Sequence, residues 1–583
     1  MFRETPLNIN AIEFDAVTGD FDNMSAATLH DAVAAAAARI PGSPVHFPNS
    51  GEYLTLLELS SAAAAAGRGL VAAGVSPGDR VGILSRNNAD FLVSLLGANA
   101  AGAGAAPLPL PASVGDLGGY AARLAALFGA AGIRRVVTGA RTEATVRRLS
   151  RALPDTEFIP AAALTGSAPL PAVTAADLAV VQFTSGSTSA PKGVQLTHSN
   201  VLHGIAAIAA GVAMTPADRG ANWLPLFHDM GLFGTLSALL TPMPMTVWTP
   251  SAFVKDPGAW LRDFAERRCS IMAAPNFGYE ALLDAVPAAE VPGLDLSCWR
   301  VAFNGAEPVL PASVERFAAH FAPAGFRPSS MYPVYGMAEA TLAVTFPPAG
   351  RGAVTTWVDR ERLAAGEVAQ APAGAPGARS FVALGRPVQG METRITDEAG
   401  RTLPAGRVGE IEIRGAAVTP GYLGADPAGN PAARDGWHQT GDLGFVHGDD
   451  LYVTGRRKEM IIIRGENYYP EDAEAAIRDL PGLHRRRCVA VADSAAGAEI
   501  ITVLGETALR DPDQVAKLAA EIHAAVARAL ELGSDRVRVH LVAPDALPRT
   551  SSGKFRRTAA RELAHVESIE KQSGGTRRSR AQL

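Results

Sequence analysis

Apolar and polar positions alternate along the first half of the chain in helix-like and strand-like patterns. Residues 56–71 are rich in Ala and Leu, which predicts a helix that ends near Gly74. Residues 80–85 and 178–183 are typical of short buried strands. A further helix is expected over residues 200–210, capped by Ser199 or Asn200. This alternation predicts an α/β architecture.

The longest uncharged stretch, residues 91–115, raises the question of a membrane span. The stretch is rich in Gly and Ala and is interrupted by Pro107, Pro109 and Pro111, whereas a spanning helix needs about 20 mostly apolar residues. We therefore expect a buried helix that leads into a buried strand, and no membrane span. The N-terminal residues lack the apolar segment of a secretory signal, so we expect a cytoplasmic protein.

The length of 583 residues predicts two or more domains. A charged break between two apolar strands places the domain boundary after residue 455, which gives a large domain over residues 1–455 and a small one over residues 456–570. Residues 350–380 are rich in Gly, Pro and Ala and form either a loose surface excursion or a small inserted subdomain. Residues 571–583 are polar and basic, as expected of a disordered tail.

Composition excludes several classes of protein. Hydrophobic residues make up 48% and charged residues 19% of the chain, as in ordinary globular proteins. A net charge of -5 does not favour general nucleic-acid binding. The cysteines, Cys269, Cys298 and Cys488, are far apart and form no CxxC pair, which argues against a disulfide framework and a zinc site.

The first candidate for chemistry is the segment TSGSTSAPKG at residues 184–193, directly after a predicted strand. Glycine and small hydroxyl residues let backbone N–H groups turn toward phosphate oxygens, and Lys192 adds a cation. The spacing is not that of a P-loop NTPase. A plain Ser/Thr/Gly surface turn is the alternative.

Further segments follow in a fixed order: NWLPLFHDMG (222–231), NGAEP (304–308), YGMAEAT (335–341), TGD (440–442), GRRK (455–458) and PRTSSGK (548–554). In this series the chain resembles the adenylate-forming superfamily, which includes acyl-CoA ligases, luciferases and peptide-synthetase adenylation domains. The resemblance covers about residues 52–557. It implies an α/β fold, with a large N-terminal domain of mixed sheets flanked by helices and a small α+β C-terminal domain.

The resemblance implies that ATP and Mg²⁺ are the cofactors. Its nucleotide-binding residues would be Thr184, Ser185, Gly186, Ser187, Thr188, Lys192, Gly305, Ala306, Glu307, Tyr335, Gly336, Met337, Asp442 and Arg456. Within this set Tyr335 would stack on adenine, and Asp442 would accept hydrogen bonds from the ribose hydroxyls. Each residue also has an ordinary structural alternative, such as a core aromatic for Tyr335 or a turn residue for Asp442. The joint order of the segments favours the functional roles.

Four other residues receive roles from the same resemblance. Glu339 would hold Mg²⁺, a hard cation that prefers carboxylate oxygen, and His228 would stand at the entrance for the substrate carboxylate. Lys554 would bridge this carboxylate and the α-phosphate, and Lys458 would be the hinge about which the small domain pivots. This interpretation requires Glu339 and residues 184–193 to share one cleft.

The resemblance implies that a carboxylate attacks the α-phosphorus of ATP, releases pyrophosphate and then passes its acyl group to a thiol. Residues 223–232, 304–308, 335–342 and 464–470 look like those of fatty acyl-AMP ligases, which would make a fatty acid the substrate. These enzymes carry an insertion at the place of residues 350–380, thought to disfavour coenzyme A and to leave an acyl carrier protein, docking in trans, as acceptor. Residues 485–487, three arginines, would suit an acidic carrier or form a solvated face. An acyl-CoA ligase and a catalytically silent nucleotide- or acyl-binding homologue remain alternatives.

Overall fold

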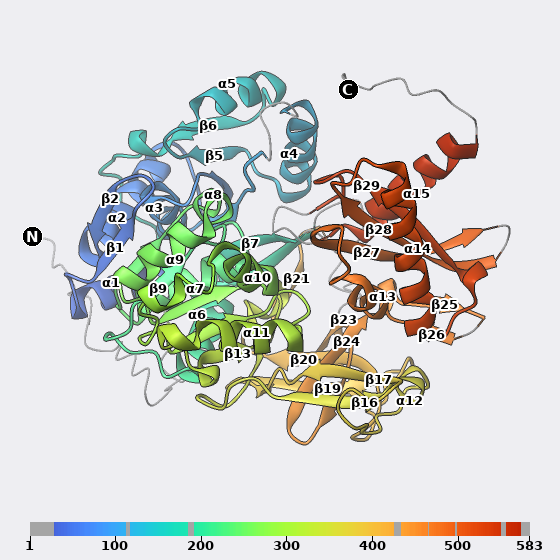
Figure 1. Ribbon diagram of the computed structural model, residues 1–583. Coiled ribbons are helices and arrows are strands. Elements are labelled where there is room, and N and C mark those ends of the chain that lie inside the picture. Colours follow the sequence, from blue (N-terminus) through green and yellow to red (C-terminus); the bar gives the residue numbers. More distant parts are fainter. Residues whose placement is uncertain are drawn as a thin grey trace, which may run out of the picture.

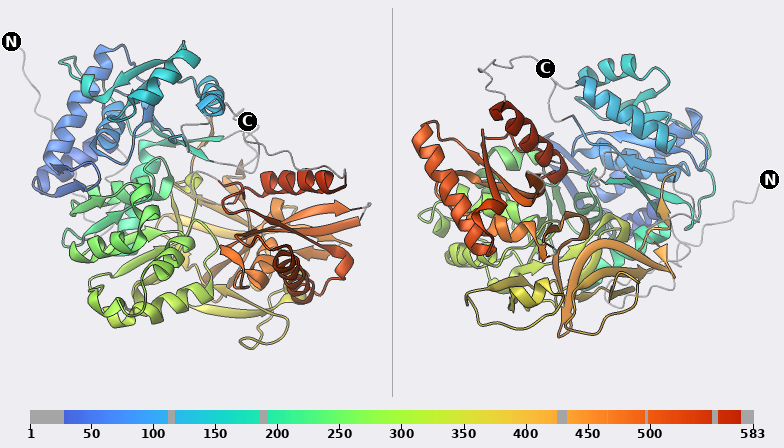
Figure 2. Two further views of the ribbon diagram at one scale, coloured as in Figure 1. Left: turned by 45° about the horizontal axis from the view of Figure 1, so that its top comes forward. Right: turned by 90° about the vertical axis from the view of Figure 1, so that its right-hand side faces the viewer.

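The protein is described here by a computed structural model, which covers residues 28–111, 117–184, 192–424, 433–464, 466–495, 498–549 and 555–572. A large N-terminal body and a smaller C-terminal lobe, orange to red, stand side by side (Figures 1 and 2). The N-terminal body contains two seven-stranded sheets flanked by helices. The predicted fold class is thereby confirmed.

The first large sheet has the strand order β21-β8-β7-β4-β3-β5-β6. Its strands are β3 (Arg80–Leu84), β4 (Gly104–Pro107), β5 (Arg135–Thr138), β6 (Glu157–Pro160), β7 (Leu178–Thr184), β8 (Lys192–Thr197) and β21 (Gly421–Tyr422). Helices α2 (Leu56–Ala72), α3 (Ala89–Ala100), α4 (Leu117–Ala131) and α5 (Glu143–Ala152) lie in the same part of the chain. Small residues let α2 and α3 approach closely, because a Cβ atom on Gly67 would lie 3.0 Å from the carbonyl oxygen of Gly97.

The second large sheet has the order β13-β12-β11-β9-β10-β1-β2. Its strands are β1 (Pro44–Phe47), β2 (Glu52–Thr55), β9 (Gly220–Asn222), β10 (Met245–Val247), β11 (Ile271–Ala274), β12 (Val301–Asn304) and β13 (Met331–Pro333). The helices of this part are α1 (Leu29–Arg39), α6 (His198–Gly211), α7 (Asp229–Leu240), α8 (Pro250–Lys255), α9 (Pro257–Glu266), α10 (Asn276–Ala285) and α11 (Pro311–Phe321). The edge strand β2 is antiparallel to β1, whereas the other pairs are parallel.

The predicted local elements are confirmed, with one correction. Helix α2 begins after Thr55, which forms a capping box with Glu58. The expected cap of α6 was wrong: the N-cap is Thr197, whose hydroxyl accepts the N–H of Asn200 at 3.1 Å while the Asn200 side chain accepts the N–H of Thr197. The uncharged stretch forms α3 and β4, a buried helix followed by a buried strand. Among the described residues, no helix is both long and apolar enough to cross a membrane.

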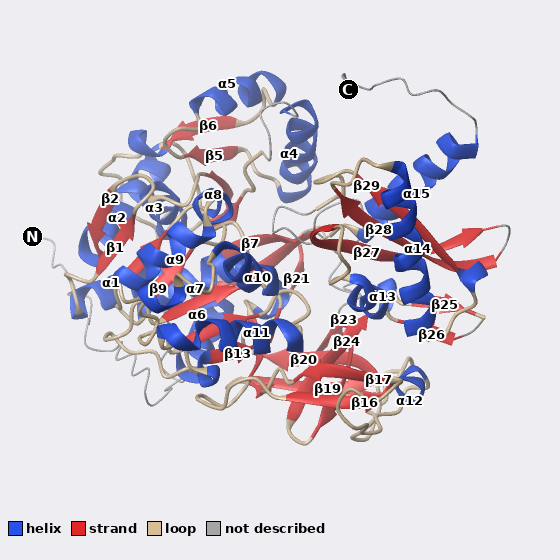
Figure 3. Cartoon of the chain, in the orientation of Figure 1, coloured by secondary structure: helices blue, strands red, loops and turns tan. Residues whose placement is uncertain are grey.

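Smaller sheets connect the N-terminal body to the C-terminal lobe. They contain β14 (Tyr335–Gly336), β15 (Ala343–Phe346), β18 (Arg386–Pro387), β19 (Met391–Thr396), β20 (Gly409–Gly415), β22 (Ala433–Arg434), β23 (Trp437–His447) and β24 (Asp450–Arg456). The region around β19, β20, β23 and β24 consists mainly of strands (Figure 3). Residues 350–380 include most of a small unit built from β16 (Thr355–Asp359), α12 (Arg360–Ala364) and β17 (Ala378–Val382).

The C-terminal lobe follows a short helical turn, η10 (Arg457–Glu459), directly after β24. It contains the hairpin β25 (Ile461–Ile463) and β26 (Glu466–Tyr468), and a sheet of β27 (Leu483–Ala495), β28 (Ala498–Thr507) and β29 (Val537–Val542). Its helices are α13 (Pro470–Ile477), α14 (Pro512–Ala529) and α15 (Arg557–Gln572). The lobe has its own cluster of buried apolar residues, which includes Ile461, Ile501 and Ile522.

Candidate functional site

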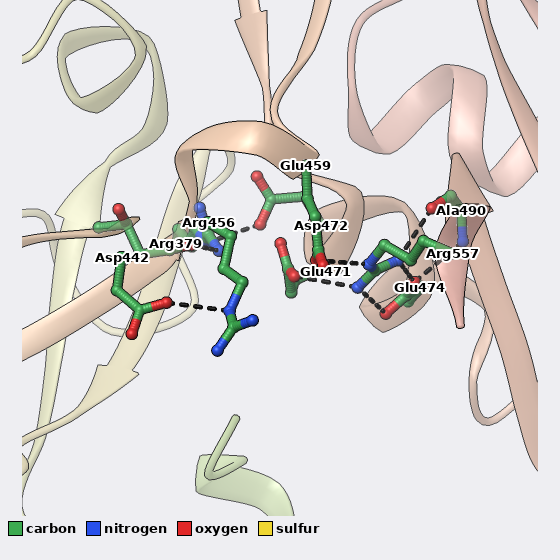
Figure 4. A network of polar contacts seen from close by, with 10 residues as sticks. Arg379, Asp442, Arg456, Glu459, Glu471, Asp472, Glu474, Ala490 and Arg557 are labelled. Atoms are coloured by element: carbon green, nitrogen blue, oxygen red, sulfur yellow. Dashed lines mark hydrogen bonds and ion pairs between the residues drawn. The ribbon is translucent and has the colours of Figure 1, made fainter. Parts of the chain in front are cut away.

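Tyr335 and Asp442, for which the resemblance implies contacts with adenine and ribose, lie in direct contact. The Tyr335 hydroxyl donates a hydrogen bond of 2.7 Å to Oδ2 of Asp442. Arg456 Nε lies 3.0 Å from Oδ1 of the same carboxylate, as Figure 4 shows. Asp442 and Arg456 are register partners on the antiparallel strands β23 and β24, which explains how the pair is held. The structure thus brings three predicted nucleotide residues together.

Burial controls the chemistry of this trio. Tyr335 is 8% and Asp442 5% exposed. Burial, and then the neighbouring Asp442 charge, raise the pKa of the Tyr335 hydroxyl, which therefore remains a neutral donor. The Asp442 charge in turn raises the pKa of Arg456. The neutral phenol of Tyr335 and the Asp442–Arg456 ion pair thus connect β14 to β23 and β24.

Glu339 lies on the short turn η8 (Ala338–Ala340) and is 9% exposed. Its Oε1 accepts a hydrogen bond of 2.7 Å from the hydroxyl of Tyr422, and its backbone carbonyl accepts one of 2.8 Å from the N–H of Thr419. Within the described part of the chain, no arginine, lysine or histidine forms an ion pair with Glu339. Burial raises its pKa, and the hydrogen bond from Tyr422 acts in the opposite direction.

The ends of the candidate phosphate segment lie side by side. Thr184 is the last residue of β7 and pairs with Lys192, the first residue of the antiparallel strand β8. The predicted residues between them, Ser185, Gly186, Ser187 and Thr188, lie outside the described residues. Lys192 is exposed, and its Nζ lies 4.8 Å from the centre of the Tyr422 ring. Tyr422 also donates the hydrogen bond to Glu339, so Lys192 and Glu339 lie on either side of the same tyrosine.

The predicted adenine-pocket backbone follows β12. Gly305 is packed so tightly that a Cβ atom would lie 2.8 Å from the Val334 side chain, and Ala306 adopts a positive φ of 66°. Glu307 accepts the N–H of Phe277 at 2.5 Å. Because Val334 N–H bonds the carbonyl of Asn304 at 2.9 Å, this turn is tied to the chain just before Tyr335.

Gly336 and Met337 continue directly from Tyr335. A Cβ atom on Gly336 would lie only 1.9 Å from the carbonyl oxygen of Leu342, and Met337 N–H donates to that same oxygen at 2.8 Å. A side chain at position 336 would therefore displace the backbone that carries Glu339.

His228 is the N-cap of α7, and its Nδ1 lies 3.8 Å from Oδ1 of Asp229. The side chain of Gln182, on β7, donates a hydrogen bond of 2.7 Å to the carbonyl of Phe227. This bond ties the His228 turn to the strand that leads into the candidate phosphate segment. Burial raises the pKa of Glu339, and the charge of Asp229 at the start of α7 acts in the same direction.

Of the two lysines predicted in the C-terminal lobe, the structure describes Lys458 but not Lys554. Lys458 is exposed on η10, between β24 and the C-terminal lobe, while Lys554 lies outside the described residues. Arg549 and Phe555 form an isolated β-bridge, with the guanidinium 4.5 Å from the ring. Burial lowers the pKa of the Arg549 guanidinium, and the charge of Glu307 acts in the opposite direction.

Sequence reasoning missed Tyr422. It is half-buried on β21, and it contacts both Lys192 and Glu339. Its ring also lies 6.4 Å from that of His438, whose pKa is lowered to about 4 by burial and by Lys192. A Gly-Tyr pair between two longer motifs is a weak signal, because nothing local marks which tyrosine will face a carboxylate.

The unit built from β16, α12 and β17 contacts the C-terminal lobe. Arg379, on β17, forms an ion pair of 2.6 Å with Asp472 of α13 and lies 4.5 Å from the Tyr469 ring. Arg360, on α12, lies 2.6 Å from Glu531, just after α14. The regular elements β16, α12 and β17 are not those of a loose excursion, and the assignment as an inserted subdomain stays a prediction.

The arginine cluster at residues 485–487 is largely occupied by contacts within the chain. Arg486 forms ion pairs with Glu280 of α10 and with Asp479, the latter at 3.2 Å. Arg487 pairs with Glu506, at 3.1 Å, and with Asp545. Two of the three arginines thus stabilise the chain itself, which weakens the case for a carrier-docking face here.

Comparison with known proteins gives a consistent result. A family model described as AMP-binding enzyme matches residues 33–423. The chain is 35% identical to the long-chain-fatty-acid–AMP ligase FadD32 of Mycolicibacterium smegmatis, over 83% of this chain and 85% of that protein. It is 34% identical to the medium-chain-fatty-acid–[acyl-carrier-protein] ligase TtuA of Teredinibacter turnerae, over 66% of this chain and 63% of that protein.

Among solved structures, one from a study of fatty acyl-adenylate ligases of E. coli and L. pneumophila superposes with a TM-score of 0.87 at 31% identity. That match covers 93% of this chain and 98% of the other. Both lobes are therefore included in the structural similarity.

Proposed function

Because the chain belongs to the AMP-binding enzyme family, we propose that it uses ATP to convert a fatty acid into an acyl-adenylate and then transfers the acyl group to a carrier protein. The phosphopantetheine thiol of an acyl carrier protein docking in trans would attack the acyl carbonyl of the adenylate, lose its proton, form the thioester and release AMP. Relatives named as fatty-acid–AMP ligases and as a fatty-acid–carrier-protein ligase support the substrate class and the acceptor.

The observation that carries this proposal is the grouping of Glu339, Tyr335 and Asp442 on adjoining elements beside β7 and β8. Asp442 and Tyr335 are 107 positions apart in sequence and yet share a hydrogen bond. Asp442 would accept the ribose hydroxyls and Tyr335 would offer its ring to adenine. Arg456, whose Nε lies 3.0 Å from Oδ1 of Asp442, would hold that carboxylate in position.

The donor set fits a magnesium ion. Glu339 is a buried carboxylate hydrogen-bonded to a neutral phenol rather than to a base, and a hard cation would supply the missing positive charge. When bound, Mg²⁺ would neutralise charge on the phosphate oxygens. Glu339 would hold it, and exposed Lys192 would meet the phosphates from the other side of Tyr422.

The protein's own residues would bring two anions together. The incoming carboxylate would attack the α-phosphorus in line, and the bond to pyrophosphate would break, with pyrophosphate leaving as an anion. Lys192 and Lys554 would offset the negative charge that gathers at the α-phosphate by electrostatic preorganisation. His228, at the start of α7, would stand where the carboxylate enters.

Lys554→Ala tests this assignment. Losing one preorganised charge typically costs about 3 kcal/mol of barrier, so ATP–pyrophosphate exchange should fall roughly 10²–10³-fold while the thermal transition stays close to that of the wild type. Lys517→Ala is a matched control, because Lys517 is an exposed lysine of α14 whose partner is Glu521 at 3.9 Å. Near-normal exchange by the Lys554 variant would contradict the role of that lysine.

The acceptor is tested by supplying either coenzyme A or a phosphopantetheinylated carrier protein to the adenylate-loaded enzyme. We expect mass spectrometry to detect acyl-carrier protein and little acyl-CoA. The ion pairs from Arg379 and Arg360 to the C-terminal lobe support this preference, because they restrain that lobe from the insertion side. Efficient acyl-CoA formation would favour the acyl-CoA ligase alternative.

The same assay separates the remaining alternative, a catalytically silent homologue. Pyrophosphate release should depend on the acid across a panel of fatty, aryl and short branched acids. An absence of acid-dependent release over the whole panel would favour the silent binding protein.

A further inference from the structure

The backbone around Tyr422 connects the two parts of the candidate site that meet phosphate and metal. Strand β21 pairs with β8, with Tyr422 opposite Val194 and Gly421 opposite Gln195. The N–H of Leu423 donates to the carbonyl of Gly193 at 2.8 Å. Tyr422 is thus fixed to the strand that begins with Lys192.

A second set of bonds fixes the same segment to Glu339. Thr419 N–H donates to the Glu339 carbonyl at 2.8 Å, and the Thr419 hydroxyl bonds the carbonyls of Gln195 and Gly421 at 2.5 and 2.9 Å. Residues 419–423 therefore join η8 to β8 through main-chain contacts. The position of Tyr422 relative to both neighbours is determined by the backbone and not by side-chain packing alone.

The Tyr422 side chain then contacts a charged group at each end. Its hydroxyl donates to Oε1 of Glu339 at 2.7 Å, and its ring faces the Lys192 ammonium at 4.8 Å. A phenol that donates to a carboxylate orients one oxygen and leaves negative charge on the group, whereas a lysine or arginine would neutralise it. An aromatic face attracts an ammonium by a cation–π interaction.

From this geometry we infer that Tyr422 is a positioning residue for the proposed adenylation site. It orients the Glu339 carboxylate toward a divalent cation and holds Lys192 beside the nucleotide phosphates. The inference rests on the proposed function, and it assigns to Tyr422 no contact with the reacting atoms. It explains why a tyrosine, which is both a hydroxyl donor and an aromatic surface, stands between the two charges.

Tyr422→Phe tests the inference by removing the hydroxyl while keeping the ring. Mn²⁺ binding to the full-length protein, measured by electron paramagnetic resonance with a non-hydrolysable α,β-methylene ATP analogue, should weaken about 10-fold or more, as expected for a lost hydrogen bond to a charged group. In pyrophosphate release, the Mg²⁺ concentration for half-maximal rate should rise by a similar factor. The rate at saturating Mg²⁺ should fall much less.

Tyr468→Phe is the matched control. Tyr468 also donates to a carboxylate, Oε2 of Glu466 at 2.6 Å, but on the hairpin of the C-terminal lobe. This variant should bind Mn²⁺ as the wild type does. Thermal unfolding of both variants identifies any loss of fold.

The outcomes separate the inference from the function on which it rests. If Glu339→Gln loses Mn²⁺ binding while Tyr422→Phe binds it with wild-type affinity and keeps its Mg²⁺ dependence, the role of Tyr422 is wrong and the proposed function stands. If the wild type shows no nucleotide-dependent Mn²⁺ binding and no acid-dependent pyrophosphate release, the proposed function itself is wrong.

Discussion

Glu339 in the N-terminal body and Glu474 in the C-terminal lobe are both buried carboxylates, but they have opposite kinds of hydrogen-bond partner. In the N-terminal body, Glu339 meets a tyrosine hydroxyl, and no basic residue of the described part forms an ion pair with it. In the C-terminal lobe, Glu474 is also buried, but Arg557 binds it through two nitrogens, as Figure 4 shows. Both carboxylates have pKa values raised by burial.

The C-terminal group is a closed network around Arg557. This guanidinium also binds Glu459 at 2.9 Å, Glu471 at 3.0 Å and the carbonyl of Ala490 at 2.8 Å. Burial lowers the pKa of Arg557, but Glu474, Glu471 and Glu459 outweigh it and raise the pKa overall. The network joins α15, α13, β27 and the η10 turn beside Lys458. Its carboxylates have a cation within the fold, whereas Glu339 would bind a metal ion under the proposed function.

Removing Arg557 should have the largest effect on stability. In Arg557→Met, the buried Glu474 and the half-buried Glu459 and Glu471 lose their shared cation, and leaving the buried carboxylate unpaired costs about 3–5 kcal/mol. Hydrogen exchange of residues 470–495 should then lose protection in the full-length protein, before the N-terminal body changes. Adding Glu474→Gln should restore part of the lost protection, because it removes the buried carboxylate that Arg557→Met leaves unpaired. Unchanged protection would show that the network contributes little to stability.

Glu339→Gln should have the opposite profile, with a large loss of activity and no loss of stability. An amide offers no anionic oxygen, so ATP–pyrophosphate exchange should fall about 10²-fold, in the range measured for single electrostatic groups. The melting temperature should not fall, because a buried charge without a basic partner is removed.

Glu506→Gln provides the control that sharpens this contrast. Glu506 is 0% exposed and paired with Arg487 at 3.1 Å. We expect its variant to unfold at lower temperature and to keep its Mg²⁺ dependence. A reversal of the two profiles would show that the distinction between the carboxylate groups is wrong.

The smallest effect is expected where the two lobes meet. Arg486 of β27 forms an ion pair with Glu280 of α10, which also binds Arg316 at 2.6 Å. Arg486→Gln should change the ratio of adenylate formation to acyl transfer about two- to fivefold, because a partly exposed pair contributes about 0.2–1 kcal/mol. Glu290→Gln breaks a pair within the N-terminal body, with Arg262 at 3.3 Å, and should leave the ratio unchanged.

The sequence by itself determined the α/β class, the order of the motifs and the family. The class follows from local patterns, such as the apolar runs that became β3 and β7 and the uncharged stretch that became α3 and β4, whereas the family came from a resemblance that the ordered motifs carry. The cap of α6 was also a local signal, and we assigned it to the wrong residue because Thr197 and Asn200 share it. The roles of Glu339, Asp442 and Lys554 came from motif order and stay predictions.

Only the tertiary structure decided which side chains meet. Tyr422 is 83 positions from Glu339, and Arg557 is 98 from Glu459, so no local pattern could pair them. The tertiary fold also places residues 350–380 against the C-terminal lobe, through the ion pairs of Arg379 and Arg360. The physical reason is that periodicity and turn chemistry act over a few residues, whereas the partner of a buried charge is set by the packing of distant strands and helices.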